Sequence, residues 1–319
     1  MGILLAAGHF QLFPDQASLF ANDVDGLFFF LLTITAFFSI LIAGLIVFFS
    51  VKYRRSVSPV RPPPPEKMWL ELTWTILPLC ICMVIFVWGA RVFALAFHPP
   101  ADALDIYVVG KQWMWKVQHP QGRREINELH IPAGRPVRLI MTSQDVIHDF
   151  FVPAFRVKQD VLPGRYTSEW FQATEPGEYH LFCAQYCGLS HADMIGTAVV
   201  MEPSKYAAWL AESPSGKSMT ETGEALYRQF GCNACHGTKA PSLAGLFDSN
   251  VVLQNGQTVR ADESYLRESI LAPRAKIVSG YQTIMPTYKG QMSEEQLAQI
   301  IEYIKSLRAF REPEPEKKQ

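Results

Sequence analysis

The chain has 319 residues, enough for two or three domains; 49% of them are hydrophobic and only 18% are charged. That composition is too apolar for an ordinary soluble protein. The formal net charge is −1 and no run of Lys or Arg occurs, which argues against nucleic-acid binding. The 6 cysteines fall into close pairs, a spacing typical of ligands or cofactor attachment more than of a disulfide framework.

Residues 1–98 are predicted to hold an N-terminal segment and two transmembrane helices, at about 27–50 and 70–97. The uncharged stretches Leu27 to Phe49 and Leu72 to Ala90 are each long enough to cross a bilayer. The loop between them is rich in Lys and Arg, so the positive-inside rule puts it in the cytoplasm and both termini outside. A pair of buried core helices is the alternative, disfavoured by the spanning length and the charged flanks.

Residues 99–203 are predicted to form a small β-sandwich or barrel of about seven or more strands. Leu104 to Val109 is rich in strand-forming residues, and Val137, Leu139 and Met141 would share one strand face. Pro-Gly pairs and the Pro132-Ala133-Gly134 turn separate the strands.

The last part of this domain holds a possible metal site. Cys183, Cys187, His191 and Met194 follow one another at short spacing, and His148 lies upstream after a predicted strand. Thiolates, imidazoles and a thioether select copper or zinc over hard ions. Zinc would leave Met194 without a role, and a mononuclear blue-copper site needs only one cysteine. Two cysteines can instead bridge two copper ions, and a Cys183–Cys187 disulfide is the remaining alternative.

Residues 27–203 resemble subunit II of cytochrome c oxidase, and the pattern Cys-x3-Cys-x3-His-x2-Met with His148 matches the dinuclear copper (CuA) site of that family. The resemblance implies a cupredoxin-like fold with Cys183 and Cys187 as bridging ligands. It implies His148 and Met194 on one copper, and His191 with the backbone carbonyl of Gln185 on the other.

Three further positions are assigned by the same resemblance. Gln185 stands where the family usually has a glutamate that helps to hold magnesium; a neutral amide is a weaker ligand for a hard cation, which weakens the case for magnesium here. Trp113 and Trp115 match an aromatic pair that receives electrons from cytochrome c, although Trp115 could equally be core. Glu71 matches a glutamate at the cytoplasmic mouth of a proton path, the alternative being an interfacial anchor.

Residues 204–220 are predicted as a linker, with Ser213 to Ser218 as its flexible polar part. Beyond it, Cys232-Asn233-Ala234-Cys235-His236 is the signature of covalent haem attachment, with His236 as an axial ligand. Met285 offers the sixth ligand, and His/Met ligation suits an electron carrier. A zinc knuckle is the rival, but no second cysteine pair is available outside the copper motif.

Residues 221–310 resemble an all-α class I cytochrome c domain, and residues 311–319 are predicted to be a disordered tail. Gly223 to Phe230 would be the helix before the haem motif. Ser293 to Leu307 carries an apolar stripe, and Ser293 with Gln296 forms a capping box. Covalent haem is attached outside the cytoplasm, in agreement with the charge-based topology. Subunit II with its own cytochrome c domain is the pattern of caa3-type oxidases.

These features predict a subunit II in a bacterial inner membrane that accepts electrons from cytochrome c or another donor. It would pass them through haem c and the copper pair to subunit I, which sits with other oxidase subunits and reduces O2 to water coupled to proton translocation. No catalytic residue for the oxygen chemistry is expected in this chain. The rivals are a copper-bearing subunit of a haem-copper nitric oxide reductase and a free-standing membrane electron carrier; a quinol oxidase subunit would lack the copper cysteines.

The remaining histidines and cysteines have no motif context. His119 and His130 are among the histidines for which surface or core roles are favoured. Cys80 and Cys82 lie in a predicted membrane helix, where small soft side chains commonly pack.

Overall fold

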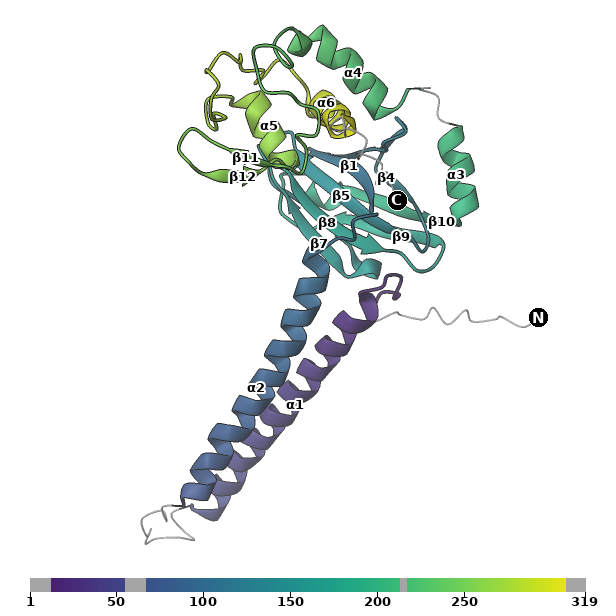
Figure 1. Cartoon of the computed structure of the whole chain (residues 1–319). Coiled ribbons are helices and arrows are strands. Elements are labelled where there is room, and N and C mark those ends of the chain that lie inside the picture. Colours follow the sequence, from purple (N-terminus) through teal and green to yellow (C-terminus); the bar gives the residue numbers. More distant parts are fainter. Residues whose placement is uncertain (1–12, 55–66, 213–216, 308–319) are drawn as a thin grey trace, which may run out of the picture.

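The structure, a computed structural model, describes residues 13–54, 67–212 and 217–307. A two-helix stalk carries a head of two domains, a β-sandwich and a smaller helical domain beside it (Figure 1). The predicted tail at 311–319, most of the basic loop between the predicted membrane helices and most of the flexible part of the predicted linker lie outside the described residues.

The stalk consists of helices α1 (Ala21–Lys52) and α2 (Met68–Phe97). Both have the length and apolar composition of membrane spans, and they extend the predicted spans by a few residues. Their side chains are exposed along most of their length, as lipid-facing surfaces require. Pro78 lies within α2, where a membrane helix tolerates it.

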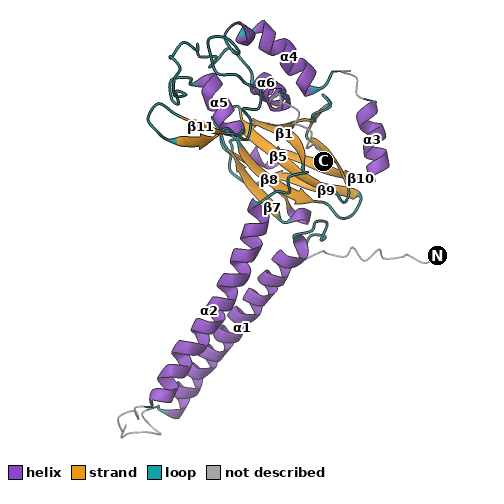
Figure 2. Ribbon diagram, in the orientation of Figure 1, coloured by secondary structure: helices purple, strands orange, loops and turns teal. Residues whose placement is uncertain are grey.

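The β-sandwich places two five-stranded sheets face to face (Figure 2). One sheet has the order β3-β2-β1-β5-β8 and the other has the order β4-β10-β9-β6-β7. Their bounds are β1 Leu104–Lys111, β2 Met114–Gln118, β3 Arg124–Ile126, β4 Glu128–Pro132, β5 Pro136–Ser143, β6 His148–Val152, β7 Val157–Val161, β8 Thr167–Gln172, β9 Gly177–Cys183 and β10 Ile195–Met201. Short 3-10 turns, η1 (Pro153–Phe155) and η2 (His191–Asp193), interrupt the second sheet's connections.

Residues on the inner faces of both sheets form one core. Val137, Leu139 and Met141 are fully buried in it, which confirms the predicted strand face. Ile140 on the opposite face of β5 is also buried, because the helical domain covers that face of the sheet.

Helix α3 (Pro203–Ala211) follows β10, so the first part of the predicted linker is helical. Its Tyr206 and Trp209 pack on the sandwich: Trp209 stacks on His130 and lies under the guanidinium of Arg123. Tertiary contacts therefore hold a nine-residue helix that would be marginal alone.

The helical domain contains α4 (Met219–Gln229), η3 (Cys232–Ala234), α5 (Glu263–Leu271) and α6 (Glu294–Ser306), with a short hairpin of β11 (Asn250–Val252) and β12 (Thr258–Arg260). The predicted capping box at Ser293 and Gln296 is confirmed. A second box, Ser218 with Glu221, starts α4 four residues earlier than predicted. Helices α4 and α6 cross at Gly223, where an added Cβ would lie 2.0 Å from the Gln299 carbonyl oxygen.

Candidate metal and haem centres

Sheet pairing brings the predicted copper ligands together. Cys183 ends β9, and the loop after it carries Cys187, His191 and Met194 before β10 begins. His148 opens β6, the neighbour of β9, with Phe150 in register with Cys183. Residues 35 positions apart in sequence therefore lie at one end of the same sheet.

The sulfur and nitrogen atoms form one compact cluster. The two Sγ atoms of Cys183 and Cys187 are 3.7 Å apart, too far for a disulfide bond of about 2.05 Å. His148 Nδ1 lies 3.9 Å from the Cys183 sulfur, and His191 Nδ1 lies 3.5 Å from the Cys187 sulfur. Met194 Sδ is 3.9 Å from the Cys187 sulfur, and the Gln185 carbonyl oxygen is 3.3 Å from the Cys183 sulfur. All six predicted copper ligands thus converge.

The electrostatics of the cluster fit bound cations. Burial by itself raises the pKa of the Cys183 thiol, but its hydrogen bonds with His148, with the backbone of Asp149 and Gln185 and with His191 together outweigh burial and lower that pKa. Burial and the adjacent Cys183 sulfur raise the pKa of the Cys187 thiol. Two buried thiolates at this separation would repel each other unless cations lay between them. The soft donor set suits copper.

Asp145 holds His148 in the orientation that a metal ligand needs. His148 is fully buried, and its Nε2 lies 2.9 Å from Asp145 Oδ1. A carboxylate partner on Nε2 fixes the imidazole and leaves Nδ1 free to coordinate, facing Cys183. Gly110 makes room for the ring, since an added Cβ would lie 2.9 Å from His148 Cδ2. Neither residue was predicted from the sequence; the position of Asp145 three residues before His148 was the available signal.

The two predicted tryptophans differ in exposure. The Trp113 indole is half-buried, and its Nε1 donates a hydrogen bond to the Cys187 carbonyl at 3.3 Å. The side-chain amide of Gln112 donates to the same carbonyl at 2.8 Å. Trp115 is fully buried between His148 and Phe150, so it presents no indole face to a partner in this structure. Electron acceptance at either residue stays a prediction.

Gln185 and Glu71 are both exposed, and their predicted roles in magnesium binding and in a proton path stay predictions. The Gln185 side chain is exposed in the copper loop, where its carbonyl faces Cys183. Glu71 is exposed in the first turn of α2, at the opposite end of the stalk from the head (Figure 1).

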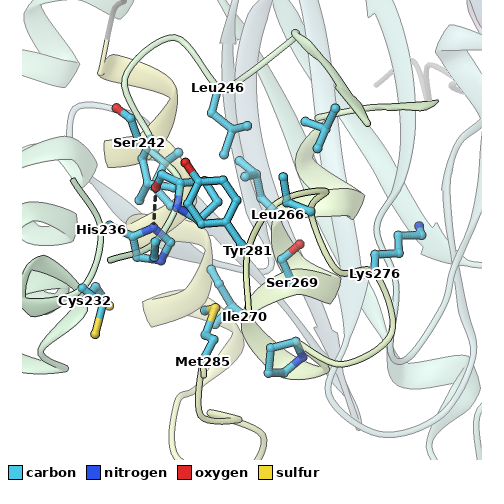
Figure 3. Close-up of a pocket in the computed structure, with 18 of the residues that line it drawn as sticks. Cys232, His236, Ser242, Leu246, Leu266, Ser269, Ile270, Lys276, Tyr281 and Met285 are labelled. Atoms are coloured by element: carbon cyan, nitrogen blue, oxygen red, sulfur yellow. Dashed lines mark hydrogen bonds between the residues drawn. The ribbon is translucent and has the colours of Figure 1, made fainter. Parts of the chain in front are cut away.

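A separate cavity of about 510 Å³ in the helical domain contains the haem motif. Cys232, Cys235, His236 and Met285 line it together with apolar side chains that include Leu246, Leu266 and Ile270 (Figure 3). A cavity of this size and apolar character can hold a haem-sized group.

The orientation of His236 fits an iron ligand. Its Nδ1 lies 2.8 Å from the Pro241 carbonyl oxygen. A carbonyl only accepts hydrogen bonds, so Nδ1 carries the proton and Nε2 keeps its lone pair for a metal. Met292 also lines the cavity, so it is a second candidate, besides Met285, for a thioether ligand.

Comparison with protein families gives three matches. Residues 6–92 match the family described as cytochrome c oxidase subunit II, transmembrane domain, and residues 123–202 match the subunit II periplasmic domain. Residues 218–304, which span the helical domain, match cytochrome c oxidase, cbb3-type, subunit III.

Individual proteins show the same similarity. Cytochrome c oxidase subunit 2 of Alkalihalophilus pseudofirmus is 29% identical over 300 residues, covering 87% of this chain and 85% of its own length. Cytochrome c oxidase subunit 2 of Synechocystis is 29% identical over 249 residues, covering 63% of this chain and 75% of its own. The solved periplasmic domain of cytochrome oxidase subunit II from Bradyrhizobium japonicum is 32% identical, covers 36% of this chain and 96% of that one, and has a TM-score of 0.35.

Proposed function

Because this chain belongs to the cytochrome c oxidase subunit II family and carries a C-terminal cytochrome c domain, we propose that it relays electrons within a membrane-anchored terminal oxidase. The route runs from an external donor, through haem c and a dinuclear copper centre, to the catalytic subunit I. Subunit I reduces O2 to water coupled to proton translocation.

One observation carries this proposal: the same chain holds a buried cluster of two cysteine sulfurs with two imidazole nitrogens, and a separate cavity with a Cys-x2-Cys-His motif. Two candidate redox sites in one molecule are what a protein needs to pass electrons from a donor to an acceptor in two steps. An oxygen-reducing centre is assigned to the partner, since the two sites with thiol and imidazole ligands described here are both assigned to electron carriers.

In the copper centre, Cys183 and Cys187 would bridge both ions through their sulfurs. His148 with Met194 and His191 with the Gln185 carbonyl would complete the two ligand sets. When bound, a copper pair shares one electron over two metals, which lowers the structural change on oxidation and reduction. The surrounding sheet ends and Asp145 keep the ligands fixed, so little rearrangement is required.

In the haem domain, Cys232 and Cys235 would form thioethers and His236 would ligate iron through Nε2. Met285 would be the sixth ligand, a combination that raises the potential into the range of an electron carrier. The Pro241 carbonyl keeps His236 in the required tautomer, and the lining of the cavity is mostly apolar.

The basic loop between the membrane helices supports an orientation with both electron-carrying domains on the extracytoplasmic side of a bacterial inner membrane. Trp113, beside the Cys187 carbonyl, is the better placed of the two aromatic candidates for receiving electrons. Glu71 at the cytoplasmic end of α2 is assigned to the mouth of a proton path in subunit I.

Electron paramagnetic resonance of the oxidised protein, purified with haem and copper supplied, tests the proposal. One unpaired electron shared by two coppers gives a hyperfine pattern distinct from that of one copper, and low-spin ferric haem should appear beside it. Mononuclear copper alone, or no copper signal in folded protein, would contradict the bridging role of Cys183 and Cys187. Cys187→Ser should abolish the shared-electron signal while leaving the haem signal, and Cys232→Ala should impair haem attachment while leaving copper.

A further inference from the structure

The two electron-carrying domains share an interface in which the haem domain covers the outer face of the β1–β5 sheet. Tyr107, Ile140 and Tyr166 of the sandwich are buried in the same cluster as apolar residues of α5 and α6. Figure 1 shows both helices lying against this sheet. The domains are therefore packed against each other and are not merely joined by a linker.

Ion pairs reinforce the interface along α6 and α5. Asp105 accepts hydrogen bonds from Arg138 within its own domain and from Lys305 of α6, each at 2.7 Å. Arg138 also reaches Glu263 of α5 at 2.9 Å. These side chains are mostly buried, so the pairs fix orientation more than they add net stability.

One interface contact reaches residues 144–147, the loop between β5 and β6 that directly precedes the proposed copper ligand His148. Glu295, in the first turn of α6, accepts a hydrogen bond from Lys116 Nζ at 2.8 Å. The amide of Gln144 donates to the same carboxylate at 3.2 and 3.3 Å. The N-terminus of a helix favours an acidic side chain, so Glu295 is charged and well placed to hold both donors.

From Gln144 the connection continues to the copper site. The next residue, Asp145, bonds His148 Nε2 at 2.9 Å and accepts the Gln112 backbone N–H at 2.8 Å. The carboxylate of Glu295 is thus separated from the proposed copper ligand His148 by the side chains of two adjacent residues.

The same helix also forms part of the haem cavity. Ile300 and Ile304 of α6 line the cavity, as does Met292, two residues before the helix begins. Helix α6 therefore contacts the proposed haem site along its length and, at its N-terminus, the β5–β6 loop that precedes His148.

We propose that Glu295 is a positioning residue that, through Lys116 and Gln144, holds the haem cavity against the β5–β6 loop, which positions His148, for electron transfer between the haem and copper sites. The inference rests on the proposed function. In the step itself, one electron leaves the haem site, which is oxidised, and reduces the copper site; no atom or proton is transferred. A fixed separation matters because small displacements of reacting centres lower rates steeply.

The test measures the rate of electron transfer from haem to copper in the purified, fully loaded oxidase after photoreduction of the haem. Glu295→Gln keeps the side chain's shape and removes its charge, and it should slow the transfer by roughly tenfold. The exchange Lys116→Glu with Glu295→Lys should restore most of the rate. Glu224→Gln, which alters an exposed pair with Arg228 away from the interface, is the matched control.

Three measurements separate positioning from general damage. Haem absorption, the copper spectrum and both midpoint potentials should be unchanged in Glu295→Gln, although the transfer rate falls. Glu302→Gln, which alters α6 where it contacts Tyr107 and Lys305, should have a smaller effect. An equal loss in Glu302→Gln, or a wild-type rate in Glu295→Gln with both centres present, would overturn the inference. Wild-type protein lacking the shared-copper signal would instead overturn the proposed function, and this inference with it.

Discussion

Arg156 of the β-sandwich donates two hydrogen bonds to the carboxylate of Asp25 in the first turns of α1, at 2.7 and 2.8 Å. Both side chains are almost completely buried, and Arg156 also binds the carbonyls of Pro14 and Asp15. Trp170 of the β-sandwich donates a hydrogen bond from its Nε1 to the carbonyl of Leu95 in the other membrane helix, α2, at 3.0 Å. The head is therefore fixed to both helices of the stalk.

Arg156→Ala should destabilise this junction, because it leaves the Asp25 carboxylate buried without its partner. Removing one member of a buried pair costs about 3–5 kcal/mol. Thermal unfolding of the detergent-solubilised protein should show the loss. Arg260→Ala, which alters an exposed pair with Asp248, should cost less than about 1 kcal/mol. Equal effects in the two variants would contradict a special role for Arg156.

Gly223→Ala should destabilise the haem domain. The new Cβ would lie 2.0 Å from the Gln299 carbonyl oxygen and 2.7 Å from its carbon, so backbone atoms of α4 and α6 must separate. Overpacking of this kind costs about 1–3 kcal/mol or more. The loss should appear as a lower midpoint of unfolding in haem absorbance. Gly44→Ala, a helical glycine with no atom within 4 Å of the added Cβ, should leave that midpoint unchanged.

The sequence predicted the parts of the molecule that depend on local spacing. The Ser293–Gln296 capping box and the buried face of Val137, Leu139 and Met141 need only a few neighbouring residues, and the structure confirms both. Cys183, Cys187, His191 and Met194 lie close together in sequence, and the structure brings them together, while their assignment as copper ligands stays a prediction based on the family resemblance.

Contacts between segments that are distant in sequence could not be predicted from residue spacing. The sequence of β5 does not indicate that Ile140 will be buried by another domain. Helix α3 carries no motif, and its stability depends on Trp209 packing against Arg123 and His130. The role of Asp145 depends on a turn that brings its carboxylate to His148, which residue spacing alone does not determine.

The choice between two methionines in the haem cavity can be tested directly. Met285→Leu preserves volume and removes the thioether, so the haem midpoint potential should fall by on the order of 0.1 V, within the range of about 0.8 V that axial ligands span. Met292→Leu should leave the potential close to that of the wild type. A spectroelectrochemical titration distinguishes the two variants, and the reverse result would assign the ligand to Met292.

Glu125 should make the β-sandwich sensitive to acid. Its carboxylate accepts from His119 Nε2 at 2.7 Å and also contacts His130. Burial by itself raises the pKa of Glu125, but the hydrogen bonds from His119 and His130 outweigh it and lower the pKa from 4.5 to about 2. Tyr206, bonded to His119, and Glu128, 4.0 Å from His130, are the other titratable groups in the cluster.

Because the pKa of Glu125 is lower in the folded state than in the unfolded state, the protein should lose stability as the pH falls. Above about pH 4.5 the carboxylate is ionised in both states and its full stabilisation is present; as pH falls, the unfolded chain binds the proton first and the stabilisation is lost. A pKa difference of this size corresponds to roughly 3 kcal/mol. Urea unfolding between about pH 5 and pH 2.5 should therefore show a steeper loss of stability in the wild type than in Glu125→Gln. Glu128→Gln, whose side chain is 59% exposed, should keep the wild-type slope. The same slope in Glu125→Gln would show that Glu125 does not supply the acid sensitivity.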